Sequence, residues 1–167
     1  SGHGTIETAV EATRIGAIRE ADESFAEAFK VGIKDQYLLG AYADFLLDQR
    51  RYQDVISLLR SETRADGLLL RLALAEQALK LPTLQNYTDE LAARFAAGRD
   101  RGTTVHVREE ARFTLTLQHD AHRALPLAQA NWNVQREPAD ARILLESALA
   151  AKNPPAAQPV LDWMKSN

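Results

Sequence analysis

The side chains best suited to metal chemistry are the histidines in the second half of the chain. His119 and His122 stand three residues apart with Asp120 between them, and His106 precedes them. Imidazole and carboxylate groups are zinc ligands, and two histidines at this spacing can share one helix face. The segment around His119 and Asp120, however, is predicted to be a turn between helices, and no HExxH motif accompanies it. We therefore interpret these residues as a solvated turn and expect no metal site.

The sequence offers little else for catalysis. The chain has no cysteine, no glycine-rich phosphate loop, and no serine beside a plausible general base. Glu109 and Glu110 are adjacent, so on a helix they point in different directions and make poor partners for acid and base roles. We expect a protein that is not an enzyme and that needs no cofactor.

Arginines gather before and after residue 100, and they are Arg94, Arg99, Arg101, Arg108 and Arg112. Such a cluster can contact phosphates, which makes a helical-repeat nucleic-acid binder the alternative function. Acidic residues interleave with the arginines, and they are Asp89, Glu90, Asp100, Glu109 and Glu110. The net charge of −3 also gives no general attraction to a polyanion. We expect a local ion-pair network here and do not expect nucleic acid as the partner.

The elements that position these residues are predicted to be helices. Apolar residues make up 46% of the 167 positions and recur three and four apart, while the alternation typical of strands is nearly missing. One apolar stripe consists of Leu39, Tyr42, Ala43 and Leu46, and a second consists of Tyr52, Val55, Ile56 and Leu59. The charged break at residues 48–51 is so short that the two helices must form an antiparallel hairpin.

The hairpin pattern recurs along the chain. Ala21 and Val55 are 34 residues apart, and each is followed four residues later by a large apolar residue, Phe25 or Leu59. The same place is occupied by Tyr87, Ala124 and Ala157. The sequence resembles the tetratricopeptide repeat family, in a degenerate, bacterial-type form, because that family repeats a helical hairpin every 34 residues with apolar residues at set offsets. Leu39, Arg71, Arg108 and Ala141 stand where the family has an aromatic residue early in the first helix.

The resemblance implies an all-α, right-handed superhelix of about ten helices in five hairpins. Residues 5–167 are interpreted as this single domain, and residues 1–4 as a tag remnant or a disordered start. A single hairpin buries too little apolar surface to fold alone, so neighbouring hairpins must stack. We expect a loop at residues 97–102, which hold two glycines, and helix starts or turns at Pro82, Pro138 and Pro154. Pro126 predicts a helix start near Leu125 or a kink.

In the family, the first helix of each hairpin lines a concave binding face, so the resemblance implies a scaffold that binds a protein or peptide. The residues expected there are Tyr37, Asp44, Asp48, Leu72, Glu76, Lys80, His106, Glu109, Glu110, Phe113, Arg142 and Glu146. Carboxylates outnumber cations in this set, so we expect a partner with Lys or Arg side chains and an apolar anchor on Tyr37 or Phe113. The alternative reading of these acids is that they form the solvated faces of helices.

The last helix raises a third possibility. Trp132 and Trp163 lie on apolar stripes and are expected to be buried or to cap the end of the stack. Leu161, Trp163 and Met164 together predict an apolar strip that can dock a sister domain or form a homodimer. No apolar run is long enough for a membrane span, so we expect a soluble protein of the cytoplasm or periplasm. We also expect no small-molecule substrate.

Overall fold

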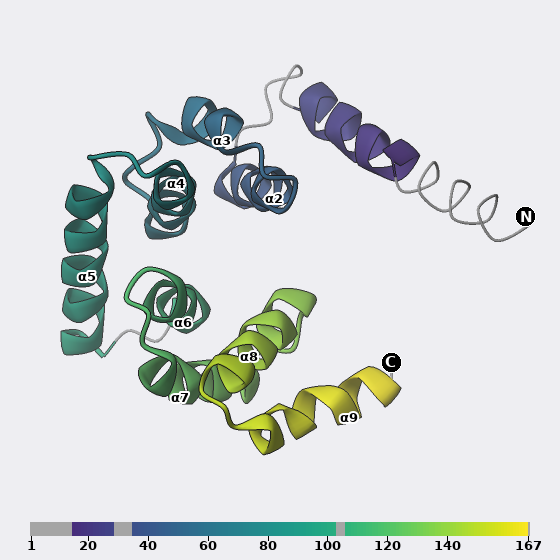
Figure 1. Cartoon of the computed structure of the whole chain (residues 1–167), viewed down its shortest axis with the longest axis vertical. Coiled ribbons are helices and arrows are strands. Elements are labelled where there is room, and N and C mark those ends of the chain that lie inside the picture. The colour runs from purple at the N-terminus through teal and green to yellow at the C-terminus, as the bar shows by residue number, and fades with distance from the viewer. Residues whose placement is uncertain (1–14, 29–34, 103–105, 167) are drawn as a thin grey trace, which may run out of the picture.

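The chain folds into helices that follow one another around an arc (Figure 1). A computed structural model describes residues 15–28, 35–102 and 106–166, and within these ranges it contains no strand. The elements are α2 (Gln36–Asp48), α3 (Tyr52–Leu59), α4 (Asp66–Leu79), α5 (Leu84–Asp100), α6 (Val107–Thr116), α7 (Ala121–Trp132), α8 (Pro138–Ala150), the 3₁₀ helix η1 (Pro154–Ala157) and α9 (Gln158–Ser166), after a helical segment at 15–28. The all-α prediction is confirmed.

Helices α2 and α3 form the hairpin that the two apolar stripes predict. Asp35 caps α2 by accepting a hydrogen bond from the Leu38 amide at 2.7 Å. Leu39, Ala43 and Leu46 of α2 are buried. After α2, Arg50 adopts a left-handed backbone conformation (φ 58°), which reverses the chain into α3.

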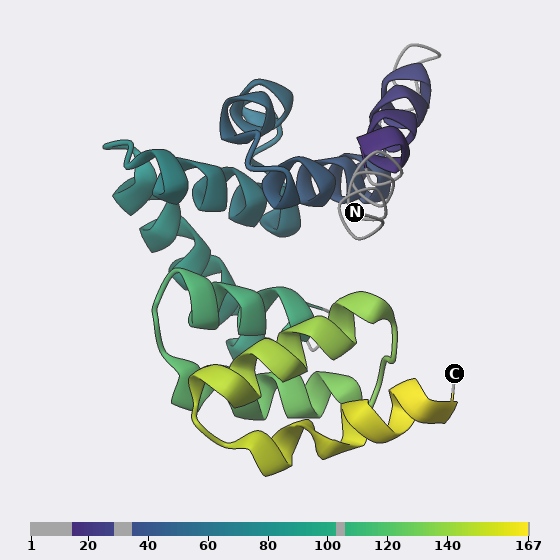
Figure 2. The ribbon, with the colours of Figure 1, turned by 45° about the vertical axis from the view of Figure 1, so that its right-hand side comes forward.

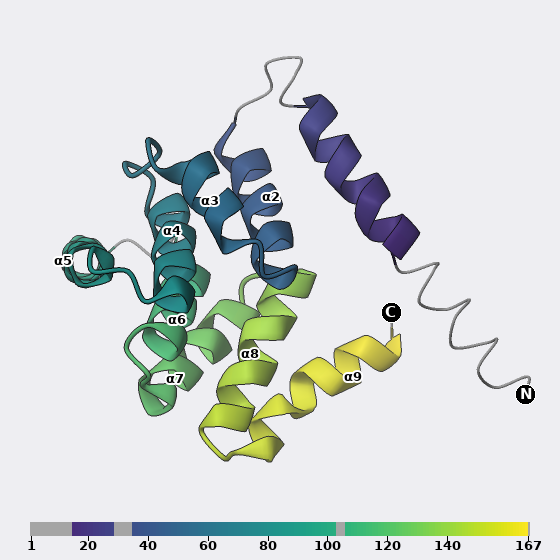
Figure 3. The ribbon, with the colours of Figure 1, turned by 45° about the horizontal axis from the view of Figure 1, so that its top comes forward.

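Alternate helices form an inner row. Along it, α2 packs on α4, α4 on α6, and α6 on α8, and we call these the inner helices. Helix α3 packs on α2 and α4, and α7 on α6 and α8, while α5 packs on α4. The outer helices α3, α5 and α7 lie on the outside of the arc in Figure 1, and Figure 3 also shows α5 outside α4.

Two hydrophobic clusters make up the core, and α6 belongs to both. The first joins buried residues of α2 to α5 with Phe113 of α6 and with Leu117, which follows that helix. The second joins Ala111 of α6 with buried residues of α7, α8, η1 and α9. Figure 2 shows the resulting halves, with the blue and teal helices α2 to α4 above the green and yellow helices α6 to α9.

The loop expected at residues 97–102 is shorter than predicted. Helix α5 continues through Gly98 to Asp100, and only then does the chain turn, with Gly102 at φ +70°. Gly98 faces open space, so the helix loses only the small stability difference between glycine and a better helix former. Ala96 and Ala97 before it are strong helix formers. The prediction of a loop over residues 97–102 is therefore wrong for residues 97–100, which belong to α5.

Proline positions agree with the predictions except in α7. Pro138 occupies the first turn of α8, and Pro154 begins η1. Helix α7 starts at Ala121, where Asp120 caps it by accepting from the Arg123 amide at 3.1 Å, and it contains Pro126. The start predicted near Leu125 is wrong. Pro126 is exposed and close to the first turn, so the hydrogen bond that it removes is at a solvated position.

Both ends of the described chain pack through aromatic residues. Phe25 of segment 15–28 stacks on Tyr42 of α2, with ring centroids 4.9 Å apart. Trp163 of α9 meets the buried Trp132 edge-on at 5.4 Å, whereas Leu161 and Met164 are exposed. The homodimer contact expected through Leu161, Trp163 and Met164 stays a prediction. Residues 1–4, and the first helix of the first predicted hairpin, lie outside the described residues.

Asp140 joins three helices in the second half. Its carboxylate is fully buried and accepts from Asn131 Nδ2 of α7 at 2.6 Å and from Arg108 Nη1 of α6 at 3.1 Å. It also accepts from the Glu137 amide at 2.9 Å, as part of the capping box that starts α8. A buried carboxylate is tolerated because all of these donors compensate its lost hydration.

Replacing Asp140 by alanine is expected to destabilise the protein by about 3 kcal/mol, because it leaves Arg108 and Asn131 without their buried acceptor. Urea unfolding followed by circular dichroism measures this change. Asp162→Ala, at an exposed position of α9, is the control and should cost about 0.5 kcal/mol or less. Equal losses of unfolding free energy in the two variants would show that Asp140 does not hold α6, α7 and α8 together.

Candidate binding groove

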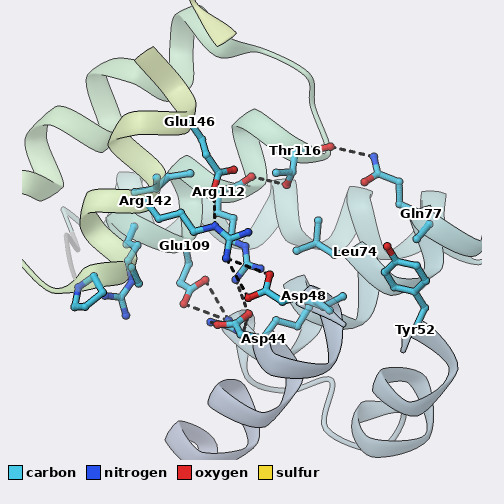
Figure 4. A pocket seen from close by; sticks show the side chains of 17 residues that line it. Asp44, Asp48, Tyr52, Leu74, Gln77, Glu109, Arg112, Thr116, Arg142 and Glu146 are labelled. Carbon is cyan, nitrogen blue, oxygen red and sulfur yellow. Dashed lines mark hydrogen bonds and ion pairs between the residues drawn. The ribbon is translucent and has the colours of Figure 1, made fainter. Parts of the chain in front are cut away.

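The inner helices enclose a groove that runs along their length. One hollow, with a volume of about 530 Å³, is lined by residues of α2, α4, α6 and α8 together with Tyr52 of α3 (Figure 4). A second hollow of about 650 Å³ lies toward the N-terminal ends of the same four helices. Asp44, Arg71 and Glu109 line both hollows. We call the two adjoining hollows together the groove, and these charged residues lie where the hollows adjoin.

Arg71 of α4 is the central residue of the groove. Its side chain is 10% exposed, and its Nε and Nη2 atoms donate to both carboxylate oxygens of Asp44 in α2, at 3.0 and 2.9 Å. Its Nη1 donates to the Gly67 carbonyl at 2.8 Å and to Glu109 of α6 at 3.3 Å. Arg71 therefore connects three inner helices. A Cβ on Gly67 would lie 3.3 Å from Nη1, so glycine leaves room for this arrangement.

Asp44 has a pKa below its ordinary value. Burial acts to raise this pKa, but the positive charges of Arg112 and Arg71 outweigh burial and favour the ionised carboxylate. Arg112 of α6 donates to Asp44 Oδ1 at 2.8 Å. The pKa of Arg71 is raised because the attraction of Glu109 and Asp44 outweighs its own desolvation, so this guanidinium keeps its proton.

Further ion pairs involve the arginines of α6 and α8 that line the groove. Arg142 of α8 reaches Asp48 of α2, with Nη1 at 3.1 Å from Oδ1, and it also pairs with Glu146 on its own helix at 2.6 Å. Arg108 pairs with the buried Asp140 at 3.1 Å and with Glu137 at 3.4 Å. In Figure 4, Arg142 and Asp48 meet from opposite sides of the hollow.

The 530 Å³ hollow is lined by as many arginines as carboxylates, namely Arg71, Arg108, Arg112 and Arg142, and Asp44, Asp48, Glu109 and Glu146. The 650 Å³ hollow adds Arg64, Asp66 and Glu137, so carboxylates outnumber arginines only slightly over the whole groove. The excess is smaller than expected because Arg71, Arg108 and Arg112 are not among the residues that the sequence places on the groove.

Apolar side chains fill the space between the charged residues. Leu47, Leu74 and Ile143 line the hollow, and Tyr52 and Gln77 close its far side in Figure 4. Gln77 donates to the Thr116 carbonyl of α6 at 3.0 Å. Mixed apolar and charged lining is typical of grooves that recognise both the shape and the charge of a bound segment.

The residues expected on the concave face fall into three groups. Asp44, Asp48, Glu109, Arg142 and Glu146 line the 530 Å³ hollow, and the 650 Å³ hollow is lined by Tyr37 and His106 in addition to Asp44 and Glu109. The structure does not place the rest on the groove, and these are Leu72, Glu76, Lys80, Glu110 and Phe113.

The misplaced residues of α4 have a common cause. Leu68, Leu69, Leu70, Leu72, Ala73, Ala75 and Glu76 are all buried, so α4 is apolar nearly all round and its pattern does not fix which face is open. The open face is the one with Arg71, Leu74 and Ala78. Leu72 lies in the core, Glu76 accepts from Thr83 Oγ1 at 2.7 Å, and Lys80 follows the end of the helix.

On α6, Phe113 and Glu110 also face away from the groove. Phe113 is 2% exposed and packs against Phe95 of α5, with ring centroids 5.3 Å apart. Phe113 is therefore a core residue, and the expected apolar anchor at this position is wrong. Glu110 is buried and pairs with Arg99.

The arginine cluster is ion-paired for the most part. Arg94 pairs with Glu90 at 2.9 Å and with Asp66 at 3.2 Å, and Arg99 pairs with Glu110. Arg108 and Arg112 line the groove, and they pair with the buried Asp140 and with Asp44, respectively. The expected ion-pair network therefore exists, although it is spread over two sides of α6. These carboxylates weigh against a phosphate-binding surface.

The histidines do not converge. His119 and Asp120 lie between α6 and α7, as the sequence predicts, and His122 is in the first turn of α7. Across the part of the chain that the structure describes, no three His, Asp or Glu side chains are grouped so as to hold a metal ion. In the same part, no helix has the length and apolar character needed to span a membrane.

Comparison of the chain with protein-family models, with curated proteins and with solved structures finds no match. The site is therefore interpreted from its own geometry and charge.

Asp44→Asn is expected to lower the stability at pH 7 and to make stability less sensitive to acid. Because the native pKa of Asp44 is depressed, its stabilising contribution is complete above the ordinary value of about 3.9 and is lost as the pH falls through the native pKa. The stability gap between the wild type and Asp44→Asn should therefore narrow between about pH 5 and pH 2. Urea unfolding at several pH values measures it.

Asp54→Asn provides the control, since it makes the same change at an exposed carboxylate of α3 that pairs with Arg51. If the Asp44 and Asp54 variants show parallel stability curves over this pH range, the ion pairs at Asp44 do not favour its charged form.

Proposed function

We propose that the chain is a helical-repeat scaffold, a right-handed superhelix of hairpins similar to tetratricopeptide repeats, and that its groove binds a segment of a protein partner. The alternation of inner and outer helices supports the superhelix, because stacked hairpins produce this order of contacts. The proposal assigns no catalytic role to the groove, and nucleic acid remains the less favoured partner because the arginines are paired.

One observation carries the proposal, namely that four successive inner helices line two adjoining hollows that share Asp44, Arg71 and Glu109. A compact ligand needs only one of the two hollows, whereas an extended or helical peptide can lie along both. The apolar side chains of Leu47, Leu74 and Ile143 provide the contact area, and the charged residues around them provide selectivity.

The charge balance changes the expected partner. A purely basic segment would face Arg112 and Arg142 as well as Asp48 and Glu146, and the carboxylate of Asp44 is already occupied by two guanidinium groups. A segment that carries both acidic and basic side chains matches this lining better. We therefore propose a mixed-charge peptide in place of the basic one.

The test is selection of peptides from a random displayed library on the intact chain, followed by affinity measurement with groove variants. Ala139 of α8 is exposed and lines both hollows, so Ala139→Trp is expected to fill the groove and weaken binding by at least about tenfold. Ala150→Trp is the matched control, because Ala150 is an exposed alanine of the same helix away from the groove. Fluorescence anisotropy measures both.

Peptides that bind the Ala139→Trp and Ala150→Trp variants equally well would place binding elsewhere on the surface. If the selected peptides lack either acidic or basic side chains, the mixed-charge partner is wrong while the groove itself stands.

A further inference from the structure

Two ion pairs connect α2 to the far half of the groove. Asp48 near the end of α2 meets Arg142 of α8, 94 positions later in the sequence, at 3.1 Å. Deeper in the groove, Asp44 meets Arg112 of α6 at 2.8 Å. We call these two pairs the strap, and Figure 4 shows both sets of side chains meeting across the hollow.

The strap joins helices that belong to different halves of the core. Helix α2 lies in the first hydrophobic cluster, and α8 lies in the second. Helices α6, α7 and α8 pack on one another, and α8 packs on η1 and α9, so these elements form one packed unit. The two halves otherwise meet where α6 packs on α4 and on Phe95 of α5. That interface is the natural pivot.

The contacts at the pivot differ in kind from those of the strap. The pivot contains the rings of Phe95 and Phe113 and the mostly buried pair of Arg71 with Glu109, whose side chains are 10% and 15% exposed. In the outer pair of the strap, the side chains of Arg142 and Asp48 are 60% and 50% exposed. Exposed ion pairs are weak, and salt screens them further. Apolar contacts such as those between Phe95 and Phe113 are not weakened by this screening.

Opening the outer pair leaves neither partner in an unfavourable environment. Arg142 keeps its second carboxylate, Glu146, at 2.6 Å on the same helix, and Asp48 is exposed enough to be hydrated. The outer pair of the strap can therefore open without disturbing the core of either half.

We propose that the strap is an autoinhibitory latch, which holds the groove narrow in the free chain and opens when salt or the charged groups of a ligand replace the contact between Asp48 and Arg142. Because the latch would regulate access to the groove, this inference rests on the function proposed above. The opening itself is a property of the free chain, so the two proposals can be tested separately.

The experiment measures the distance between the halves by double electron–electron resonance. The chain has no cysteine, so nitroxide labels can be attached specifically to Ser57→Cys on α3 and Leu149→Cys on α8, which are exposed positions in different halves. Asp48→Asn and Arg142→Gln remove the outer pair. Glu90→Gln is the control, since it removes an exposed ion pair that lies within α5.

In low salt, the labelled wild type is expected to give a short, narrow distance distribution. In both strap variants the distance distribution should shift to longer distances. The shift should exceed the width of the distribution in the Glu90→Gln control. The Debye length falls from about 30 Å at 0.01 M to about 3 Å at 1 M salt, so adding salt should move the wild type to the distribution of the strap variants and leave those variants unchanged. Circular dichroism and urea unfolding check that each variant remains folded.

Distances that coincide in the wild type and the folded Asp48→Asn variant, or a wild type that does not respond to salt, would overturn the latch. Neither result affects the comparison of Ala139→Trp with Ala150→Trp. Conversely, a chain that opens with salt but whose peptides ignore Ala139→Trp would retain the latch and reject the groove as the binding site.

Discussion

The buried guanidinium of Arg71 is the contact on which the arrangement of the inner helices depends. Removing a charged group from water is costly, and this cost is met only because Asp44, Glu109 and the Gly67 carbonyl together accept from its donors. These acceptors belong to α2, α6 and α4, so the three helices must keep their relative positions for the charge to be satisfied. Apolar packing alone tolerates small shifts, whereas this hydrogen-bond geometry does not. Arg71 therefore fixes the floor of the groove.

Arg108 repeats this role one inner helix later. It lies on α6, 37 residues after Arg71 in the sequence, and it connects α6 to the buried Asp140 of α8. At both positions an aromatic residue is expected on the proposed likeness to tetratricopeptide repeats. The chain instead joins its inner helices at these positions through ion pairs. The consequence is a groove lined by charges of both signs, which are held in place by the ion pairs between its helices.

The sequence predicted those features that depend on local periodicity. The stripes of α2 and α3, the turn at His119 and Asp120, and the start of α8 at Pro138 follow from patterns within single helices, and the structure agrees with them. The failures concern contacts between distant residues. Leu72 and Glu76 were assigned to the groove because α4 is apolar on nearly every face, and Arg71 was overlooked because its partners are 27 and 38 residues away. Gly98 and Pro126 are tolerated inside helices because both face solvent.

The most direct test of the central claim is a double-mutant cycle on Arg71 and Asp44. The free energy of unfolding is measured for the wild type, for Arg71→Met, for Asp44→Asn and for the double variant. If Arg71 holds α2 on α4 through Asp44, the two changes are strongly non-additive, with a coupling energy of about 2 kcal/mol. A coupling energy near zero would mean that the two side chains contribute independently, and the buried guanidinium would then not be the contact that sets the positions of the inner helices.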